Sequence, residues 1–151
     1  LRREIGRTVL LQGEDNKQRL LKTFVENGRA VLVATSSFWE GIDVRGAALS
    51  CVIIDKLPFA SPDDPQLKAR VEDCKLKGGD PFAELQLPKA VIALKQGVGR
   101  LIRDRSDHGV LVICDPRVVN KPYGATFIKS LPAIPRTREL ATLGEFFGPR
   151  E

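Results

Sequence analysis

Residues 50–59 read SCVIIDKLPF, an apolar run that Pro58 brings to an end. Residues 30–35 (AVLVAT) and 109–115 (GVLVICD) have the same form, and residues 8–13 (TVLLQG) end in a glycine. Strands that are apolar along their whole length are typical of parallel sheets, because helices cover both faces of such sheets. We therefore predict a strand at each of these four ranges.

Helical patterns alternate with these strands. The predicted helices lie at 15–28, 63–79, 88–104, 123–131 and 136–147. In the first of them, Asp15 or Asn16 is placed to cap the start and Gly28 to end the helix. This alternation is typical of an α/β sandwich with a mostly parallel sheet and helices on both faces. Ligands of open α/β sheets bind beyond the carboxyl ends of the strands, so the polar residues that follow each strand are candidate site residues.

The composition is that of a globular domain: 151 residues, 42% hydrophobic and 28% charged. The chain begins at Leu1 and contains no methionine, so we expect a piece of a longer polypeptide. No apolar run approaches the roughly 18 residues of a membrane helix. The three cysteines are far apart, which argues against a metal or disulfide site, and we expect Cys51 and Cys114 to act as small core residues.

The formal net charge of +5 favours an anionic partner such as nucleic acid, a nucleotide or an acidic protein. Solvated lysines explain the same charge without any partner. The two interpretations remain open on composition alone.

Residues 95–104 read KQGVGRLIRD and lie in the predicted helix 88–104. Arg100 and Arg103 are three residues apart and Gln96 is one turn earlier, so all three project from one side of a helix. Guanidinium groups suit phosphate oxygens because they stay charged and bond bidentately. A glycine such as Gly99 costs about 1 kcal/mol in a helix interior, which is tolerated where a phosphate or another backbone approaches closely. A surface helix with solvated arginines is the alternative.

Residues 36–46 read SSFWEGIDVRG and follow the second predicted strand. Gly41 allows a ligand or a partner domain to approach the backbone closely, and Asp43 offers an acceptor for a sugar hydroxyl or an arginine. The alternative is a capped turn in which Asp43 holds backbone amides.

The chain has no G-x-x-x-x-G-K-[ST] phosphate loop, and its VIID run ends in the single aspartate Asp55. An arginine row suited to phosphate, in a chain without a phosphate loop, suggests an active site shared with another domain. An arginine supplied in this way accelerates phosphoryl transfer by roughly 10³–10⁵-fold.

Two of these stretches, VATSSFWEGIDVRG (33–46) and QGVGRLIRD (96–104), resemble motifs V and VI of superfamily 2 DNA helicases. Together with VIIDKLPF (52–59) and GVLVICDPR (109–117), they resemble the XPD-like branch of the bacterial DinG/YoaA type. The resemblance covers almost the whole chain.

The resemblance implies that residues 1–151 are a second RecA-like motor domain, a three-layer sandwich with a mostly parallel sheet. The sequence also predicts an inserted arm at 69–87 and a C-terminal helix or tail at 136–151.

Carried over by the resemblance, Arg100 and Arg103 reach the γ-phosphate of ATP across the cleft. The other residues that it places at the nucleotide are Gln96, Gly99, Glu40, Gly41 and Asp43. Candidates for contact with single-stranded DNA are Thr35, Ser36, Ser37, Arg117 and Tyr123. For the first three of these, a hydrogen-bonded cap at the strand end is the alternative.

The resemblance further implies that the cofactor is ATP with Mg²⁺, bound mainly by a first motor domain that is absent from this chain. That first motor domain is also expected to carry a 4Fe–4S cluster. Expected partners are single-stranded or forked DNA, that first motor domain and the chi subunit of the DNA polymerase III clamp loader. We expect 5′–3′ DNA unwinding in repair and replication, in the bacterial cytoplasm at the nucleoid, and no activity from this chain alone. The alternative is a non-catalytic module that binds nucleic acid or a replication protein.

Overall fold

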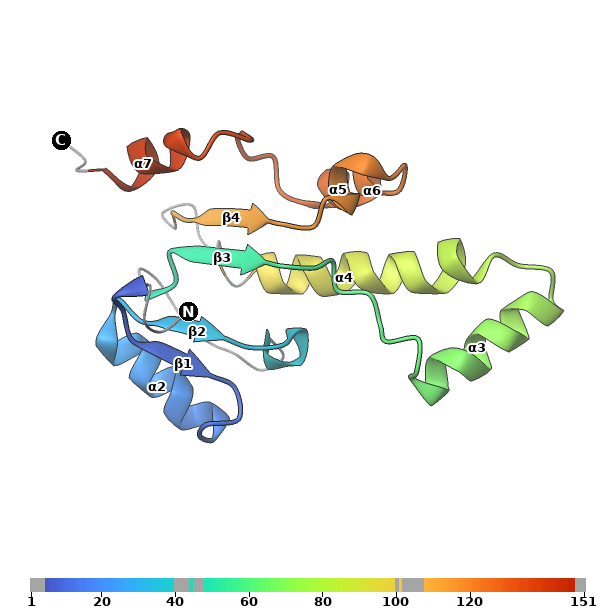
Figure 1. Ribbon diagram of the computed structural model, residues 1–151. Coiled ribbons are helices and arrows are strands. Elements are labelled where there is room, and N and C mark those ends of the chain that lie inside the picture. The colour runs from blue at the N-terminus through green and yellow to red at the C-terminus, as the bar shows by residue number, and fades with distance from the viewer. Residues whose placement is uncertain (1–4, 40–43, 45–47, 100, 102–107, 149–151) are drawn as a thin grey trace.

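The computed structural model describes residues 5–39, 44, 48–99, 101 and 108–148. Its four strands are β1 (Val9–Leu11), β2 (Val31–Val33), β3 (Cys51–Ile54) and β4 (Val110–Ile113). All four arrows point the same way in Figure 1 and follow one another in the order β1, β2, β3, β4. The chain is therefore an α/β domain with parallel strands, as the apolar runs predicted.

The strands are shorter than predicted and form two sheets among the described residues. β1 pairs with β2, and β3 pairs with β4. Among the described residues, no pairing joins β2 to β3. The third strand ends at Ile54 rather than at Pro58, since the chain bends at Asp55 and Lys56.

Helix α2 (Lys17–Asn27) joins β1 to β2 and has the caps that its sequence predicts. The Asn16 side chain accepts a hydrogen bond from the Arg19 amide at 2.9 Å. Gly28 ends the helix with φ 65°, a left-handed conformation that glycine adopts without a steric cost. Leu20 on this helix is buried with Phe38 and Val44 in a small core beside β1 and β2.

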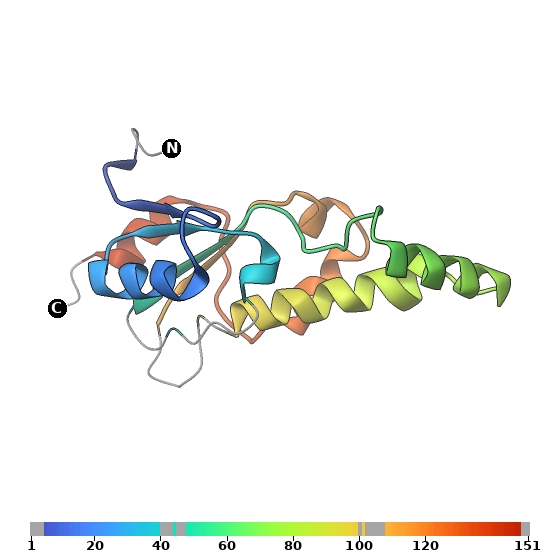
Figure 2. The same cartoon turned by 90° about the horizontal axis from the view of Figure 1, so that it is seen from below.

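Three segments form a long extension beyond β3 (Figures 1 and 2). Helix α3 (Pro65–Leu76) begins at Asp64, whose side chain accepts from the Gln66 and Leu67 amides. A π-helical turn, η3 (Phe82–Gln86), leads into α4 (Leu87–Val98), and the Leu87 amide donates to the Phe82 carbonyl five residues earlier. In both views α3 lies at the far end of the molecule from α7.

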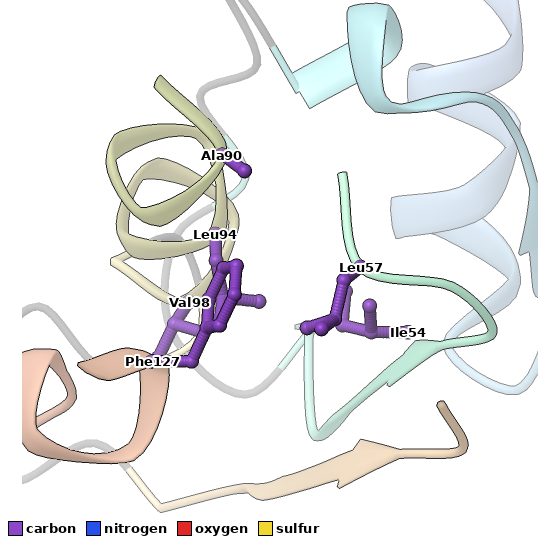
Figure 3. Close-up of a cluster of buried hydrophobic side chains, with 6 residues drawn as sticks. All are labelled: Ile54, Leu57, Ala90, Leu94, Val98 and Phe127. Atoms are coloured by element: carbon purple, nitrogen blue, oxygen red, sulfur yellow. The ribbon is translucent and has the colours of Figure 1, made fainter. Parts of the chain in front are cut away.

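The larger core lies between α4, β3 and α6 (Gly124–Ser130), as Figure 3 shows. Leu94 and Phe127 are fully buried there. The other buried members of this core are Ile54, Leu57, Ala90 and Val98. Because α4 supplies three of its six residues, this core fixes α4 against the end of β3.

Two further helices are α5 (Arg117–Asn120) and α7 (Ala141–Phe147). Helix α7 begins five residues later than predicted, and α5 was not predicted. Cys114 is exposed, so its expected place in the core was wrong: β4 ends at Ile113, just before it. Within the described ranges, no helix has the length and apolar character needed to cross a membrane.

Candidate functional site

The carboxyl ends of β1 and β2 are tied together by side chains. Gln12 follows β1, and its Oε1 accepts hydrogen bonds from the Thr35 amide at 2.8 Å and the Thr35 hydroxyl at 3.0 Å. The Gln12 amide donates in turn to the Val33 carbonyl at 2.9 Å. Thr35 is exposed at this edge. Thr35 therefore makes the strand-end hydrogen bonds that the sequence analysis gave as the alternative to DNA contact. Its contact with DNA stays a prediction.

A single 3₁₀ turn, η1 (Ser36–Trp39), follows Thr35. Ser36 is exposed at its start, and the backbone of Ser37 lies within it. Phe38 is buried, and the Lys17 ammonium lies 5.1 Å from the centre of its ring. The burial of Phe38 anchors this turn to the core beside α2. The predicted motif V residues Glu40, Gly41 and Asp43, which come next, lie outside the described residues.

The end of α4 carries the residues predicted from motif VI. Gln96 is exposed in the last turn, and the helix ends at Val98 rather than at the predicted residue 104. Gly99 follows in right-handed conformation, with its amide donating to the Lys95 carbonyl at 2.8 Å. The glycines at 97 and 99 account for the early end, because glycine is a poor helix former. Arg100 and Arg103 lie outside the described residues.

Leu101, which lies between the two predicted arginines, is 4% exposed. Its amide donates to the Val98 carbonyl at 2.9 Å. A Cβ atom added at Gly109, just before β4, would clash with the Leu101 side chain. The buried Leu101 side chain therefore packs against the start of β4.

Turn η1 contacts helix α4, and the two views agree that it lies near the end of that helix (Figures 1 and 2). The structure thus brings Thr35 and Ser36 to the same region as Gln96 and Gly99. These segments are separated by about sixty residues of chain, so the fold and not the local sequence brings them together.

Asp115 follows β4 and is the only buried charged residue in the described part of the chain. Its Oδ2 accepts from the Leu57 amide at 2.8 Å, which ties the end of β4 to the chain beyond β3. Arg117 donates to both carboxylate oxygens: Nε lies 2.9 Å from Oδ1, and Nη2 lies 2.6 Å from Oδ2.

The hydrogen bonds from Arg117 hold the pKa of the Asp115 carboxyl well below its usual range. Burial acts in the opposite direction, and the amides of Leu57 and Arg117 add to the lowering. Asp115 in turn raises the pKa of the Arg117 guanidinium, and nearby Tyr123 adds a smaller contribution of the same sign. The pair is therefore charged at neutral pH.

Arg117 and Tyr123, both predicted to contact DNA, lie beside a cluster of rings. The Arg117 guanidinium is 5.3 Å from the centre of the Phe59 ring. Tyr123 packs edge-on against Phe59 with 5.8 Å between the ring centres, and its ring is tilted against that of Phe82 at 5.1 Å. The Arg117 side chain is 40% exposed, and Tyr123 is half-buried, so each has a structural partner and an open side. Their contact with DNA stays a prediction.

The sequence analysis missed two residues of this edge, Gln12 and Asp115. Each lies at the carboxyl end of a predicted strand, Gln12 in 8–13 and Asp115 in 109–115, which is where polar residues of an open α/β sheet gather. For Asp115 a further signal was available, because an arginine follows two residues later. Among the described residues, no group of three or more His, Cys, Asp or Glu side chains is placed to hold a metal ion. The donors at this edge are amides, hydroxyls and guanidinium groups, which suit phosphate.

Comparisons with protein families, curated proteins and solved structures all find similarity to helicases. Residues 2–134 match the family of helicase C-terminal domains. Over 138 residues the chain is 71% identical to the ATP-dependent DNA helicase YoaA of Escherichia coli, covering 91% of this chain and 22% of that protein. It is 39% identical to the ATP-dependent helicase DinG of Mycobacterium tuberculosis over 132 residues, covering 87% and 20%.

A solved XPD helicase structure covers 88% of this chain with a TM-score of 0.66 and 26% identity, although the match spans only 25% of that structure. This similarity confirms the RecA-like α/β fold that the motifs implied. The chain spans about a fifth of the length of the YoaA and DinG relatives. The chain is similar to the YoaA and DinG helicases and to XPD helicase, and from its match over residues 2–134 we conclude that it belongs to the family of helicase C-terminal domains.

Proposed function

We propose that this chain is the second motor domain of an ATP-dependent DNA helicase, and that it completes an ATP site shared with a first motor domain. The observation that carries the proposal is the contact between η1 and α4. Turn η1 lies in the motif V stretch, and the last turn of α4 begins the motif VI stretch. In this arrangement a change at the nucleotide is transmitted directly to the residues proposed to hold DNA.

In this mechanism Arg100 and Arg103 approach the γ-phosphate when the two motor domains close. Their positive charge stabilises the charge that develops on the transferring phosphoryl group. Gln96 contributes a polar contact at the cleft, Gly99 leaves room beside the phosphate, and the motif V residues Gly41 and Asp43, oriented by Glu40, link this site to the DNA. Hydrolysis then releases the arginines, and the domains separate.

We propose that DNA is held at the carboxyl ends of the strands. Thr35, Ser36 and Ser37 contact its phosphates, and Arg117 and Tyr123 extend the track toward α5. Alternating grip by the two domains moves a single strand, in the 5′–3′ direction that the resemblance implies.

As the resemblance implies, we propose that the first motor domain binds most of the ATP with its Mg²⁺ and carries the 4Fe–4S cluster. We further propose that the full-length protein acts on forked DNA in repair and replication, and that its C-terminal tail binds the chi subunit of the clamp loader. Its proposed location is the bacterial cytoplasm, at the nucleoid.

The test is the substitution Arg100→Ala in the full-length protein. DNA-stimulated ATP turnover should fall by roughly 10³-fold or more, because an arginine of this kind contributes that much to phosphoryl transfer. Affinity for single-stranded DNA should change little. Lys95→Ala is the matched control, since Lys95 is an exposed cation on α4, five residues earlier in the chain.

Near-normal turnover in Arg100→Ala would contradict the proposal. It would favour the non-catalytic binding module, which needs no arginine directed at a γ-phosphate. A loss of turnover in both variants would point to a general effect on α4 and would also remove the support for Arg100.

A further inference from the structure

The side chain of Gln12 joins the carboxyl ends of β1 and β2, which lie side by side (Figure 1). The ladder between these two strands ends at the pair Leu11 and Val33. Beyond that pair, the backbone amide of Gln12 donates to the Val33 carbonyl at 2.9 Å, and its side-chain oxygen accepts from Thr35. Gln12 therefore lies at the edge where the proposed function places DNA.

Both hydrogen-bond donors of Thr35 are engaged by Gln12. A threonine has two donors, its backbone N–H and its hydroxyl. The Thr35 amide nitrogen lies 2.8 Å and the hydroxyl oxygen 3.0 Å from the same acceptor, Gln12 Oε1. The phosphate oxygens of DNA are acceptors, so proteins bind them with donor groups. In this arrangement Thr35 has no donor left for a phosphate.

The side-chain amide of Gln12 is in the opposite situation. Its Oε1 accepts two hydrogen bonds, which is the capacity of an amide oxygen. Its Nε2 carries two N–H donors, and no described residue accepts a hydrogen bond from them. Gln12 is exposed, so these donors are open to solvent. Because the amide group is planar, the two bonds to Oε1 also fix the orientation of Nε2.

A cation lies beside the same edge. The Lys17 ammonium is 5.1 Å from the centre of the Phe38 ring, and Phe38 belongs to turn η1, which directly follows Thr35. The acidic residues of the loop after β1, Glu14 and Asp15, each accept a hydrogen bond from a backbone amide. The edge thus combines oriented neutral donors with a positive charge, and its carboxylates already have backbone partners.

We propose that Gln12 donates from Nε2 to a phosphate of single-stranded DNA, and that Thr35 is a positioning residue that orients the Gln12 amide. The inference rests on the proposed function and refines one part of it, because the phosphate contact at Thr35 is made through Gln12. A phosphate contact carries no base information, so Gln12 fixes the position of the strand and does not select its sequence.

The alternative is that Gln12 and Thr35 only close the end of the sheet. That role uses Gln12 Oε1 alone, whereas the proposed contact also uses Nε2. Gln12→Glu distinguishes the two roles, because it preserves the shape of the side chain and an oxygen that accepts from Thr35. It replaces the donor with a second oxygen, and the resulting negative charge repels a phosphate.

The first test measures the affinity of the full-length protein for single-stranded oligothymidylate in the absence of nucleotide. Gln12→Glu should weaken binding by about 10-fold or more, since hydrogen bonds to a charged group are among the stronger ones. Its thermal unfolding midpoint should stay at that of wild type. Gln18→Glu is the matched control: Gln18 is exposed on α2, and the same change of charge there should weaken binding by less than about 2-fold.

Equal affinities for Gln12→Glu and Gln18→Glu, with normal DNA binding by wild type, would overturn this inference and leave the proposed function intact. A wild-type protein that fails to bind single-stranded DNA would instead contradict the proposed function, and this inference with it.

The second test examines whether Thr35 acts through Gln12. Thr35→Val removes the hydroxyl but keeps the shape of the side chain, so it should weaken DNA binding by about 2–10-fold. In the Gln12→Ala background the same substitution should have no further effect, because its partner is already gone. Additive losses would show that Thr35 contacts DNA directly and would overturn the proposal. This comparison decides the matter even if Gln12→Glu lowers the unfolding midpoint, and neither test requires ATP hydrolysis.

Discussion

Asp115 links three parts of the chain through one buried carboxylate. It follows β4, accepts from the Leu57 amide beyond β3, and holds the first residue of α5 through the Arg117 guanidinium. A buried acceptor of this kind is costly to leave without its donors. The placement of Arg117 and Tyr123 at the candidate site therefore depends on Asp115.

We predict that Asp115→Asn destabilises the domain by about 2 kcal/mol, since hydrogen bonds to a charged group contribute roughly that much. The folded-state pKa of Asp115 lies below its ordinary value of 3.8, so its contribution is complete above that pH and is lost as the pH falls below it. Chemical unfolding of wild type between about pH 5 and about pH 3 should therefore show a steeper loss of stability than the same series on the variant.

Asp63→Asn provides the control for this substitution. Asp63 is exposed and lies 3.4 Å from Lys68, a surface ion pair that contributes little. If Asp63→Asn and Asp115→Asn lowered stability equally, the role given to the buried carboxylate would be wrong.

Gly109 provides a second prediction at the residue scale. A methyl group there would push on Leu101, and it would lie 3.2 Å from the Ser50 carbonyl oxygen. Gly109→Ala should cost about 1–3 kcal/mol in stability and should also lower the kcat of ATP hydrolysis, because Leu101 adjoins Arg100. The KM for DNA should stay close to that of wild type.

Gly144→Ala is the comparison for this variant, since nothing lies within 4 Å of the added methyl group in α7. Equal turnover in Gly109→Ala and Gly144→Ala would show that the position of Leu101 does not affect the arginine.

At the scale of the elements, α4 connects the larger core to the candidate site. Its buried side is anchored at Leu94 and Val98, and its last turn carries Gln96. We predict that Leu94→Ala lowers the free energy of unfolding by about 2–5 kcal/mol, because it leaves a cavity in a closely packed core. Ile92→Ala on the same helix removes a side chain that is 57% exposed and should cost much less. Thermal unfolding of the two variants tests this, and similar midpoints would contradict the assigned packing.

The sequence predicted elements best where a local interaction defines a boundary. Asn16 and Gly28 delimit α2 because one accepts a backbone hydrogen bond and the other adopts a left-handed conformation. The sequence-based prediction was wrong where an element boundary depends on backbone hydrogen bonding or on packing against distant residues. The π-helical bond from Leu87 to Phe82 leaves no mark in the apolar pattern, and Cys114 lies one residue past the end of β4.

For the whole molecule, the net charge of +5 has a measurable consequence. We predict that Lys121→Ala, beside α5, lowers the slope of log affinity for single-stranded DNA against log salt by about 0.7 in the full-length protein, the value for one lost phosphate contact. Lys22→Ala on α2 should leave the slope unchanged, because Lys22 pairs with Glu26 on a surface away from α5. Equal slopes for Lys121→Ala and wild type would contradict the proposal that single-stranded DNA passes beside α5.

The alternation of apolar runs correctly predicted parallel strands and an α/β fold, because burial on both faces leaves a clear pattern. The same pattern could not predict that no pairing joins β2 to β3 among the described residues, since an apolar run does not specify its neighbour. The sequence could not predict the spatial arrangement of the candidate site either. Thr35 and Gln96 come to one region only through the packing of η1 on α4.

The π-helical turn between α3 and α4 sets the direction in which the extension points. Such a turn holds one residue more than the α-helix around it, and each residue of an α-helix rotates the chain by about 100°. Removing one residue from Phe82–Gln86 would therefore swing α3 about a quarter turn around the axis of α4, while Leu94 and Val98 kept their places in the core. A single insertion or deletion there would let related chains aim this extension at different surfaces without altering the motor.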